Sequence, residues 1–103
     1  AGPVKILFET GSKTVGADGM KVIENLSIMM KANGTIKVNI SGYADRSGNA
    51  DQNLELAKER AMAVRDALKA AGVADGQLVL AKPEFAIGGA EADARRVEMT
   101  LVQ

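Results

Sequence analysis

The spacing of apolar positions along the chain changes between two periods, and each period predicts one type of element. Residues 35–41 alternate strictly, with Ile36, Val38 and Ile40 on one face and polar side chains on the other, which is typical of a half-buried strand. Residues 4–9 are mostly branched and apolar and are followed by turn-forming Thr10-Gly11-Ser12, so they also predict a strand. The predicted strands are residues 4–9, 35–41, 77–81 and 96–102.

Two longer segments carry apolar residues at helical spacing. The first, residues 18–32, is followed by Asn33-Gly34, and the second, residues 53–71, is followed by Gly72. The expected buried stripes are Val22, Ile23, Leu26, Met29 and Met30 in the first helix and Leu54, Ala57, Ala61, Val64 and Leu68 in the second. Residues 42–52 and 83–93 are expected to be polar loops. The order βαβαββ predicts an α+β two-layer sandwich, with both helices packed on one face of a mixed parallel/antiparallel sheet.

Composition narrows the functional classes. The 103 residues fit one compact domain, and their 13 basic and 13 acidic side chains balance, which argues against a nucleic-acid partner. Cys and His are absent, which removes thiolate and imidazole chemistry and the usual zinc ligands, so no metal or other cofactor is expected. No apolar run approaches the about 20 residues that span a bilayer. Because no signal peptide precedes Ala1, any export signal or anchor is expected to lie outside this sequence.

One group of polar residues could form a ligand site. Asp45 follows the second predicted strand, and Asn53 and Arg60 lie seven residues apart, within about 20° on one side of the second helix. The start of a helix and an arginine both attract a carboxylate, and Asp45 on the opposite wall would attract an ammonium. Spacing alone favours a direct ion pair between Asp45 and Arg60, with a zwitterion-binding site as the alternative.

Several short motifs, in order and at fitting separations, resemble the OmpA-like peptidoglycan-binding domain. They are Gly42-Tyr43-Ala44-Asp45-Arg46-Ser47-Gly48, the run from Asn53 through Arg60-Ala61 to Val64, and Arg95-Arg96-Val97-Glu98. The family shows Gly-His-Thr-Asp-x-x-Gly at the first, Asn-x-x-Leu-Ser-x-x-Arg-Ala-x-x-Val at the second and Arg-Arg-Val-Glu at the third. This chain departs from the pattern at Tyr43-Ala44, which replaces His-Thr, and at Ala57, which replaces Ser.

The resemblance implies a non-catalytic periplasmic module that holds the cell wall through the diaminopimelate of its stem peptides. The family's ligand-gripping residues fall on Asp45 and Arg60, with Asn53 shaping the site and Phe8, Glu9 and Thr10 bordering it. It also implies that residues 1–103 are one domain of a longer outer-membrane protein or lipoprotein that tethers the outer membrane to peptidoglycan.

Two other functions remain open at this stage. A wall hydrolase would need two carboxylates facing one cleft with the pKa of one raised, and the spacing of Glu55, Glu59 and Asp66 gives no basis for that. A structural domain could dimerise through its first helix or a sheet edge and use Asp45 and Arg60 only as an internal ion pair.

Overall fold

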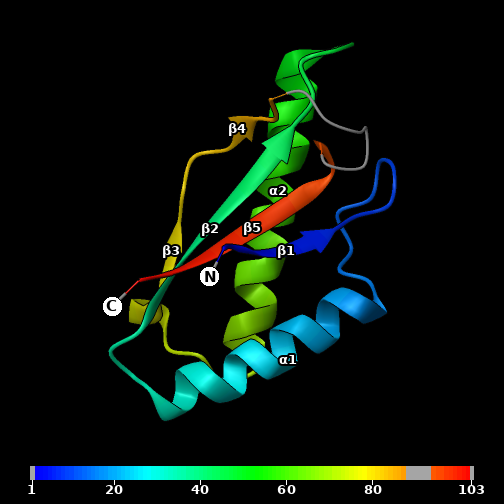
Figure 1. Cartoon of the computed structure of the whole chain (residues 1–103). Coiled ribbons are helices and arrows are strands. Elements are labelled where there is room, and N and C mark those ends of the chain that lie inside the picture. The colour runs from blue at the N-terminus through cyan, green and yellow to red at the C-terminus, as the bar shows by residue number, and fades with distance from the viewer. Residues whose placement is uncertain (1, 88–93, 103) are drawn as a thin grey trace.

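The computed structural model describes residues 2–87 and 94–102. Its elements follow one another as β1 (Val4–Leu7), α1 (Ala17–Ala32), β2 (Lys37–Ala44), α2 (Ala50–Ala70), a 3₁₀ turn η1 (Asp75–Gln77), β3 (Leu78–Leu80), β4 (Glu84–Phe85) and β5 (Arg96–Val102). Both helices pack against the sheet; in the view of Figure 1, α2 passes behind the strands and α1 lies below them. The predicted two-layer α+β architecture is confirmed.

The sheet is mixed, and β2 is its central strand. Its order is β1-β5-β2-β3, with β5 antiparallel to both β1 and β2 and with β3 parallel to β2. The short strand β4 extends the β3 edge and pairs in parallel with the end of β2. β5 pairs with β2 as far as Gly42, and β4 pairs with Tyr43 and Ala44 on the other edge, so partner strands hold β2 up to the point where the chain leaves the sheet before Asp45.

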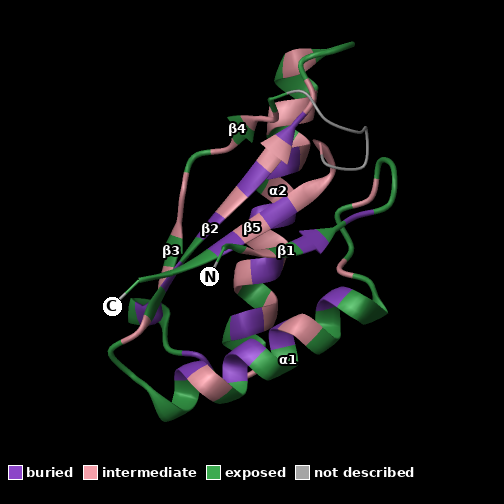
Figure 2. Ribbon diagram, viewed as in Figure 1, coloured by how far each residue is buried: buried purple, intermediate pink, exposed green. Residues whose placement is uncertain are grey.

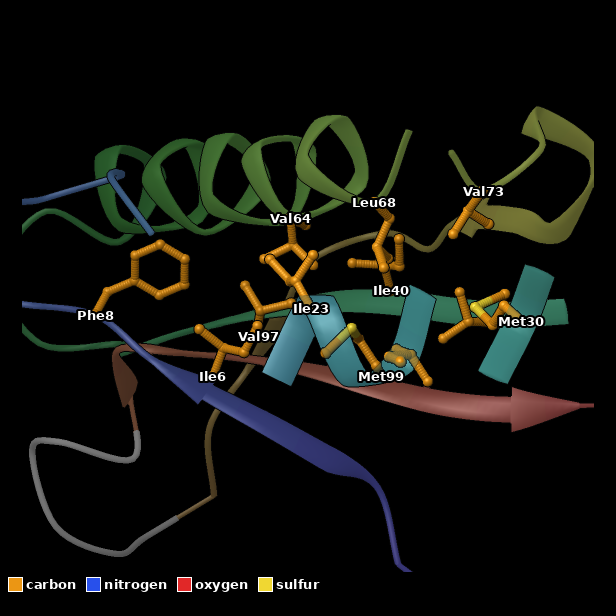
Figure 3. Close-up of a cluster of buried hydrophobic side chains, with 13 residues drawn as sticks. Ile6, Phe8, Ile23, Met30, Ile40, Val64, Leu68, Val73, Val97 and Met99 are labelled. Atoms are coloured by element: carbon orange, nitrogen blue, oxygen red, sulfur yellow. The ribbon is translucent and has the colours of Figure 1, made fainter. Parts of the chain in front are cut away.

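The core lies between the sheet and the helices and is almost entirely aliphatic. The strict alternation predicted for the second strand is observed, since Val38 and Ile40 are buried and Lys37 and Asn39 are exposed. The buried face of α2 consists of Ala57, Arg60, Ala61, Val64 and Leu68. Figure 2 shows the buried positions gathered on the inner faces of the helices and the sheet. In the close-up of Figure 3, Phe8 lies at one end of this cluster and Met30 at the other.

The structure corrects several predicted boundaries. β2 continues to Ala44, because Tyr43 and Ala44 pair with Glu84 and Phe85 of β4, a strand within the expected loop 83–93. Residues 88–93 of that loop lie outside the described part of the chain. α2 begins at Ala50, because the side chain of Asn49 accepts a hydrogen bond from the backbone N–H of Gln52 and caps the helix. The loop carrying Asp45 is therefore much shorter than expected.

The ends of two other predicted strands also differ. β1 ends at Leu7, although the backbone N–H of Phe8 still donates to the carbonyl of Arg95. Gln77 belongs to η1 and not to the following strand.

A close approach of β2 to α2 depends on Gly42. A Cβ atom at this position would overlap the carbonyl oxygen of Ala57, which belongs to the helix backbone and cannot move aside alone. The missing side chain therefore lets the helix lie directly against the strand just before the chain reaches Asp45.

Gln77 holds the opposite end of the molecule together. Its side chain is only 6% exposed, and its Nε2 group donates to the carbonyls of Met30, Asn33 and Ile36 at 2.9, 3.1 and 3.0 Å. These carbonyls lie at the C-terminal end of α1 and in the turn that leads into β2, where helix carbonyls lack intrahelical donors. One neutral side chain thus closes this helix end.

Candidate functional site

A cavity of about 240 Å³ lies beside α2 at the end of the molecule where β2 leaves the sheet. It is lined by Thr10, Gly11, Ala44, Asp45, Ser47, Asn53, Leu56, Arg60, Ala94 and Arg95. The structure therefore brings four of the predicted site residues, Thr10, Asp45, Asn53 and Arg60, to one cavity. Phe8 and Glu9 border it through their contacts with Arg60.

Arg60 is the most deeply buried charged group at the cavity. Its side chain is only 3% exposed, and its Nε and Nη2 groups donate to the carbonyls of Ser12 and Glu9 at 2.7 and 3.1 Å. A guanidinium has five N–H donors. The three remaining donors have no acceptor among residues 2–87 and 94–102, and no carboxylate there pairs with Arg60.

The environment of Arg60 disfavours its charge without removing it. Burial, and secondly the positive charge of Arg95, lower the pKa of Arg60 from its usual value. An arginine nevertheless keeps its proton in proteins, because its pKa begins far above neutrality. The cavity therefore contains a desolvated positive charge whose remaining hydrogen-bonding capacity is available to an anion.

The segment before α1 contacts Arg60 through a ring and through backbone carbonyls. The ring of Phe8, itself only 4% exposed, has its centroid 5.3 Å from the guanidinium carbon of Arg60. Glu9 contributes its backbone carbonyl, while its side chain faces solvent, and Thr10 forms part of the wall. Packing and two carbonyls together fix the orientation of the guanidinium.

Asp45 lines the same cavity from a tightly turned loop. Its Oδ1 atom accepts a hydrogen bond from the backbone N–H of Ser47 at 2.9 Å. Hydrogen bonds from the backbone and side chain of Ser47 hold the pKa of Asp45 below its usual value, so this group is a carboxylate at neutral pH. Gly48 then takes a φ of +70°, a left-handed conformation that turns the chain into α2 and that favours glycine.

Asn53 shapes this loop without taking part in an ion pair. Its Nδ2 group donates to the backbone carbonyls of Asp45 and Ser47 at 2.9 and 2.8 Å. Both ends of the three-residue turn are thereby attached to α2, and the position of the Asp45 carboxylate relative to the helix is fixed.

The structure does not contain the direct ion pair that spacing alone favoured. Asp45 and Arg60 both lie in the described part of the chain, and no ion pair or hydrogen bond joins them. Asp45 accepts a hydrogen bond from Ser47 instead, and Arg60 donates to two carbonyls. The cavity also differs from the expected helix-end site. Arg60 lies ten residues after Ala50, nearly three turns into α2, and the side of the helix lines the cavity. The charged group that α2 contributes to the cavity is therefore the guanidinium of Arg60 on the side of the helix.

Sequence reasoning missed six lining residues, namely Gly11, Ala44, Ser47, Leu56, Ala94 and Arg95. Leu56 and Ala44 add apolar surface to the cavity. Arg95 precedes β5, where Arg96 lies on the other face of the sheet with its guanidinium carbon 3.8 Å from the ring centroid of Tyr43. Alternation along the closing strand could have separated the roles of these two arginines.

The cavity is lined by the Asp45 carboxylate, by the guanidinium of Arg60 and by the apolar side chains of Ala44 and Leu56. Such an arrangement fits a molecule that carries an ammonium and a carboxylate on a small aliphatic frame. Within the described part of the chain, no group of three or more acidic, histidine or cysteine side chains is placed to hold a metal ion. No described helix has the length and apolar character that would allow it to cross a membrane.

Comparison with known proteins matches this architecture to one family. The family model described as the OmpA family matches residues 7–96. The probable lipoprotein YiaD of Escherichia coli (strain K12) is 31% identical over 106 residues, covering 96% of this chain and 48% of that protein. The peptidoglycan-associated lipoprotein of Agrobacterium fabrum is 30% identical over 69 residues, covering 67% of this chain and 39% of that protein. The chain thus spans less than half the length of either relative.

A solved structure supports the same relationship in three dimensions. The crystal structure of the peptidoglycan-associated lipoprotein from Burkholderia pseudomallei superimposes with a TM-score of 0.82 at 28% sequence identity, covering 95% of this chain and 89% of that one. The match includes the elements that carry both charged groups of the cavity, since residues 7–96 contain Asp45 and Arg60. The chain therefore belongs to the OmpA family.

Proposed function

We propose that this domain binds peptidoglycan non-covalently by the free amino-acid end of diaminopimelate in a stem peptide. The observation that carries the proposal is the buried guanidinium of Arg60, which is oriented by two carbonyls and a ring and has no acidic partner in the described chain. Burying a charge is costly unless a partner compensates for it. A ligand carboxylate would supply that compensation.

The two charged groups suit the two ends of a zwitterion. The carboxylate of the ligand would accept hydrogen bonds from Arg60, and its ammonium would donate to the carboxylate of Asp45. The aliphatic part of the ligand would then lie against Leu56 and Ala44. Asp45 is held by Ser47 and Asn53 before any ligand arrives, so little ordering of the loop is needed on binding.

The relatives support the cellular context of this proposal. Proteins named peptidoglycan-associated lipoproteins are among the sequences and structures similar to this chain. Because these relatives are longer, we place residues 1–103 as one domain of a larger protein. In that setting the domain would work in the periplasm, as a binding module without turnover that tethers the outer membrane to the cell wall.

Retention on isolated sacculi tests the function and the residues together. The native domain should sediment with sacculi, whereas Asp45→Asn should reduce its affinity by about tenfold or more, because the ammonium of the ligand loses its charged partner. The asparagine can still accept from Ser47, so the loop should keep its shape. Asp66→Asn is the matched control, since Asp66 pairs with Arg65 outside the cavity.

Competition identifies the ligand. Soluble diaminopimelate should release the bound domain, and cadaverine, the diamine left when both carboxyl groups are removed, should not. Equal sedimentation of the native domain and Asp45→Asn would contradict the assignment of the site. Release of soluble wall fragments by the domain would contradict a purely binding role.

A further inference from the structure

Arg46 directly follows Asp45, yet its side chain is held outside the cavity. Its guanidinium carbon lies 4.1 Å from the ring centroid of Phe85, the last residue of β4. At this distance the face of an aromatic ring attracts a cation. Neither Arg46 nor Phe85 is among the residues that line the cavity. The positive charge that follows Asp45 in the chain is therefore held against β4.

The sheet fixes the position of the Phe85 ring. Phe85 pairs with Ala44, the last residue of β2, and the backbone N–H of Ala86 donates to the carbonyl of Ala44 at 2.8 Å. The neighbouring Glu84 is attached to the same strand, because its Oε2 atom accepts a hydrogen bond from the hydroxyl of Tyr43 at 3.2 Å. The ring is thus placed beside the loop by strand pairing and does not depend on the loop for its own position.

The carboxylate of Asp45 is not paired with the neighbouring guanidinium. Asp45 and Arg46 both lie within residues 2–87, and no ion pair joins them there. Hydrogen bonds from Ser47 are the main cause of the lowered pKa of Asp45, and the backbone of Arg46 makes a smaller contribution, whereas the guanidinium of Arg46 makes none. The structure therefore keeps two adjacent opposite charges apart.

We propose that Phe85 is a positioning residue for the ligand site, because its ring holds the guanidinium of Arg46 away from Asp45 and so leaves the carboxylate open to the ammonium group of a ligand. This inference rests on the proposed function and adds to it a residue that lies outside the cavity. Without the ring, Arg46 would compete with the ligand, since a guanidinium and an ammonium bind to the same carboxylate oxygens.

Removal of the ring tests this role. Phe85→Leu keeps an apolar side chain on β4 but has no ring face, so Arg46 would be released. The affinity for a synthetic stem tripeptide that ends in diaminopimelate should then fall by about two- to fivefold, the range expected for competition by an exposed ion pair. Titration calorimetry measures this change. Phe85→Tyr keeps a ring and should bind the tripeptide like the native chain.

A second substitution separates positioning from structural support. Adding Arg46→Met to Phe85→Leu removes the competing charge and should restore the native affinity, which it would not do if the first change had damaged the fold. Arg65→Met is the matched control, because Arg65 lies outside the cavity and pairs with Asp66. Added to Phe85→Leu, it should leave the affinity low. Thermal unfolding of each variant measures any loss of stability.

The other outcomes distinguish this inference from the proposed function. Native affinity in Phe85→Leu would overturn the inference and leave the proposed function intact. Weak binding that persists after Arg46→Met is added would also overturn it, because Phe85 would then act only as a support of β4. Failure of the native chain to bind the tripeptide would overturn the proposed function, and this inference with it.

Discussion

The two ends of the molecule are each closed by one buried polar side chain that gathers backbone carbonyls. At one end Arg60 binds the carbonyls of Glu9 and Ser12, and at the other Gln77 binds those of Met30, Asn33 and Ile36. Both side chains are almost fully buried, at 3% and 6% exposure. The aliphatic core runs between these ends, as the positions of Phe8 and Met30 show in Figure 3.

Gln77 and Arg60 differ in charge, and we relate the neutral side chain to stability and the charged one to the proposed ligand. The two N–H groups of the Gln77 amide are shared among three carbonyls, and the side chain carries no charge. Arg60 donates to only two carbonyls. It also carries a buried positive charge, which hydrogen bonds to carbonyls do not require. A neutral donor is enough to hold a turn in this fold. The proposed ligand would account for the charge of Arg60, which hydrogen bonds to two carbonyls do not require.

The largest expected effect is the loss of stability caused by a substitution at Gln77. Gln77→Glu keeps the shape of the side chain but places a carboxylate against three carbonyl oxygens, so it should lower the free energy of unfolding by about 3–5 kcal/mol. Urea unfolding measures this change. Gln52→Glu makes the same exchange at an exposed position in the first turn of α2 and should leave stability nearly unchanged. A small effect of Gln77→Glu would mean that the amide contacts do little for the fold.

Arg60 should show the reverse pattern. Arg60→Met keeps an unbranched apolar side chain beside Phe8 and removes the buried charge, so the free energy of unfolding should change by no more than about 1–1.5 kcal/mol. Affinity for sacculi should fall by at least about 30-fold, because the carboxylate of the ligand loses its partner. Arg65→Met is the control and should alter neither quantity much. If Arg60→Met did not fold, Arg60 would be required for stability, which would contradict its assignment to ligand binding.

The smallest effect is expected from pH. Hydrogen bonds from Ser47 lower the pKa of Asp45, so its ionised form is favoured in the folded state, and its contribution to stability is lost only as pH falls through that lowered pKa. The chain has no histidine, so no side chain with an unperturbed pKa titrates between about pH 5 and 7. Retention on sacculi should stay nearly constant over this range and decline only below about pH 4. A midpoint near pH 6 would point to a different group.

Periodicity predicted most of the fold because the core is aliphatic and continuous. The alternation around Val38 and the stripe around Val64 each depend on one buried face, and the structure confirms both except at Leu54, which is only partly buried. The end of β2 could not be predicted in the same way. Tyr43 and Ala44 belong to the strand because β4 pairs with them, and that partner is only two residues long and lies far along the chain.

The sequence predicted which residues line the site but not which groups they contact. Motif spacing identified Asp45, Asn53 and Arg60, and the structure brings all three to one cavity. Spacing could not show that backbone carbonyls would engage Arg60, because the segment that provides them lies some 50 residues earlier. A charge at a buried helix position looks the same in a sequence whether its partner is a carboxylate, a carbonyl or a ligand. Arg95 was missed for the same reason.

The central position of β2 has a mechanical consequence for a tether. A wall fragment held in the cavity would pull on Asp45 at the end of β2 and on Arg60 within α2, so tension would enter the domain through two elements that Gly42 brings into direct contact. Neighbouring strands bond β2 on both sides, and its displacement would require hydrogen bonds along both edges to break together. Such a load path resists shear better than attachment through a surface loop would.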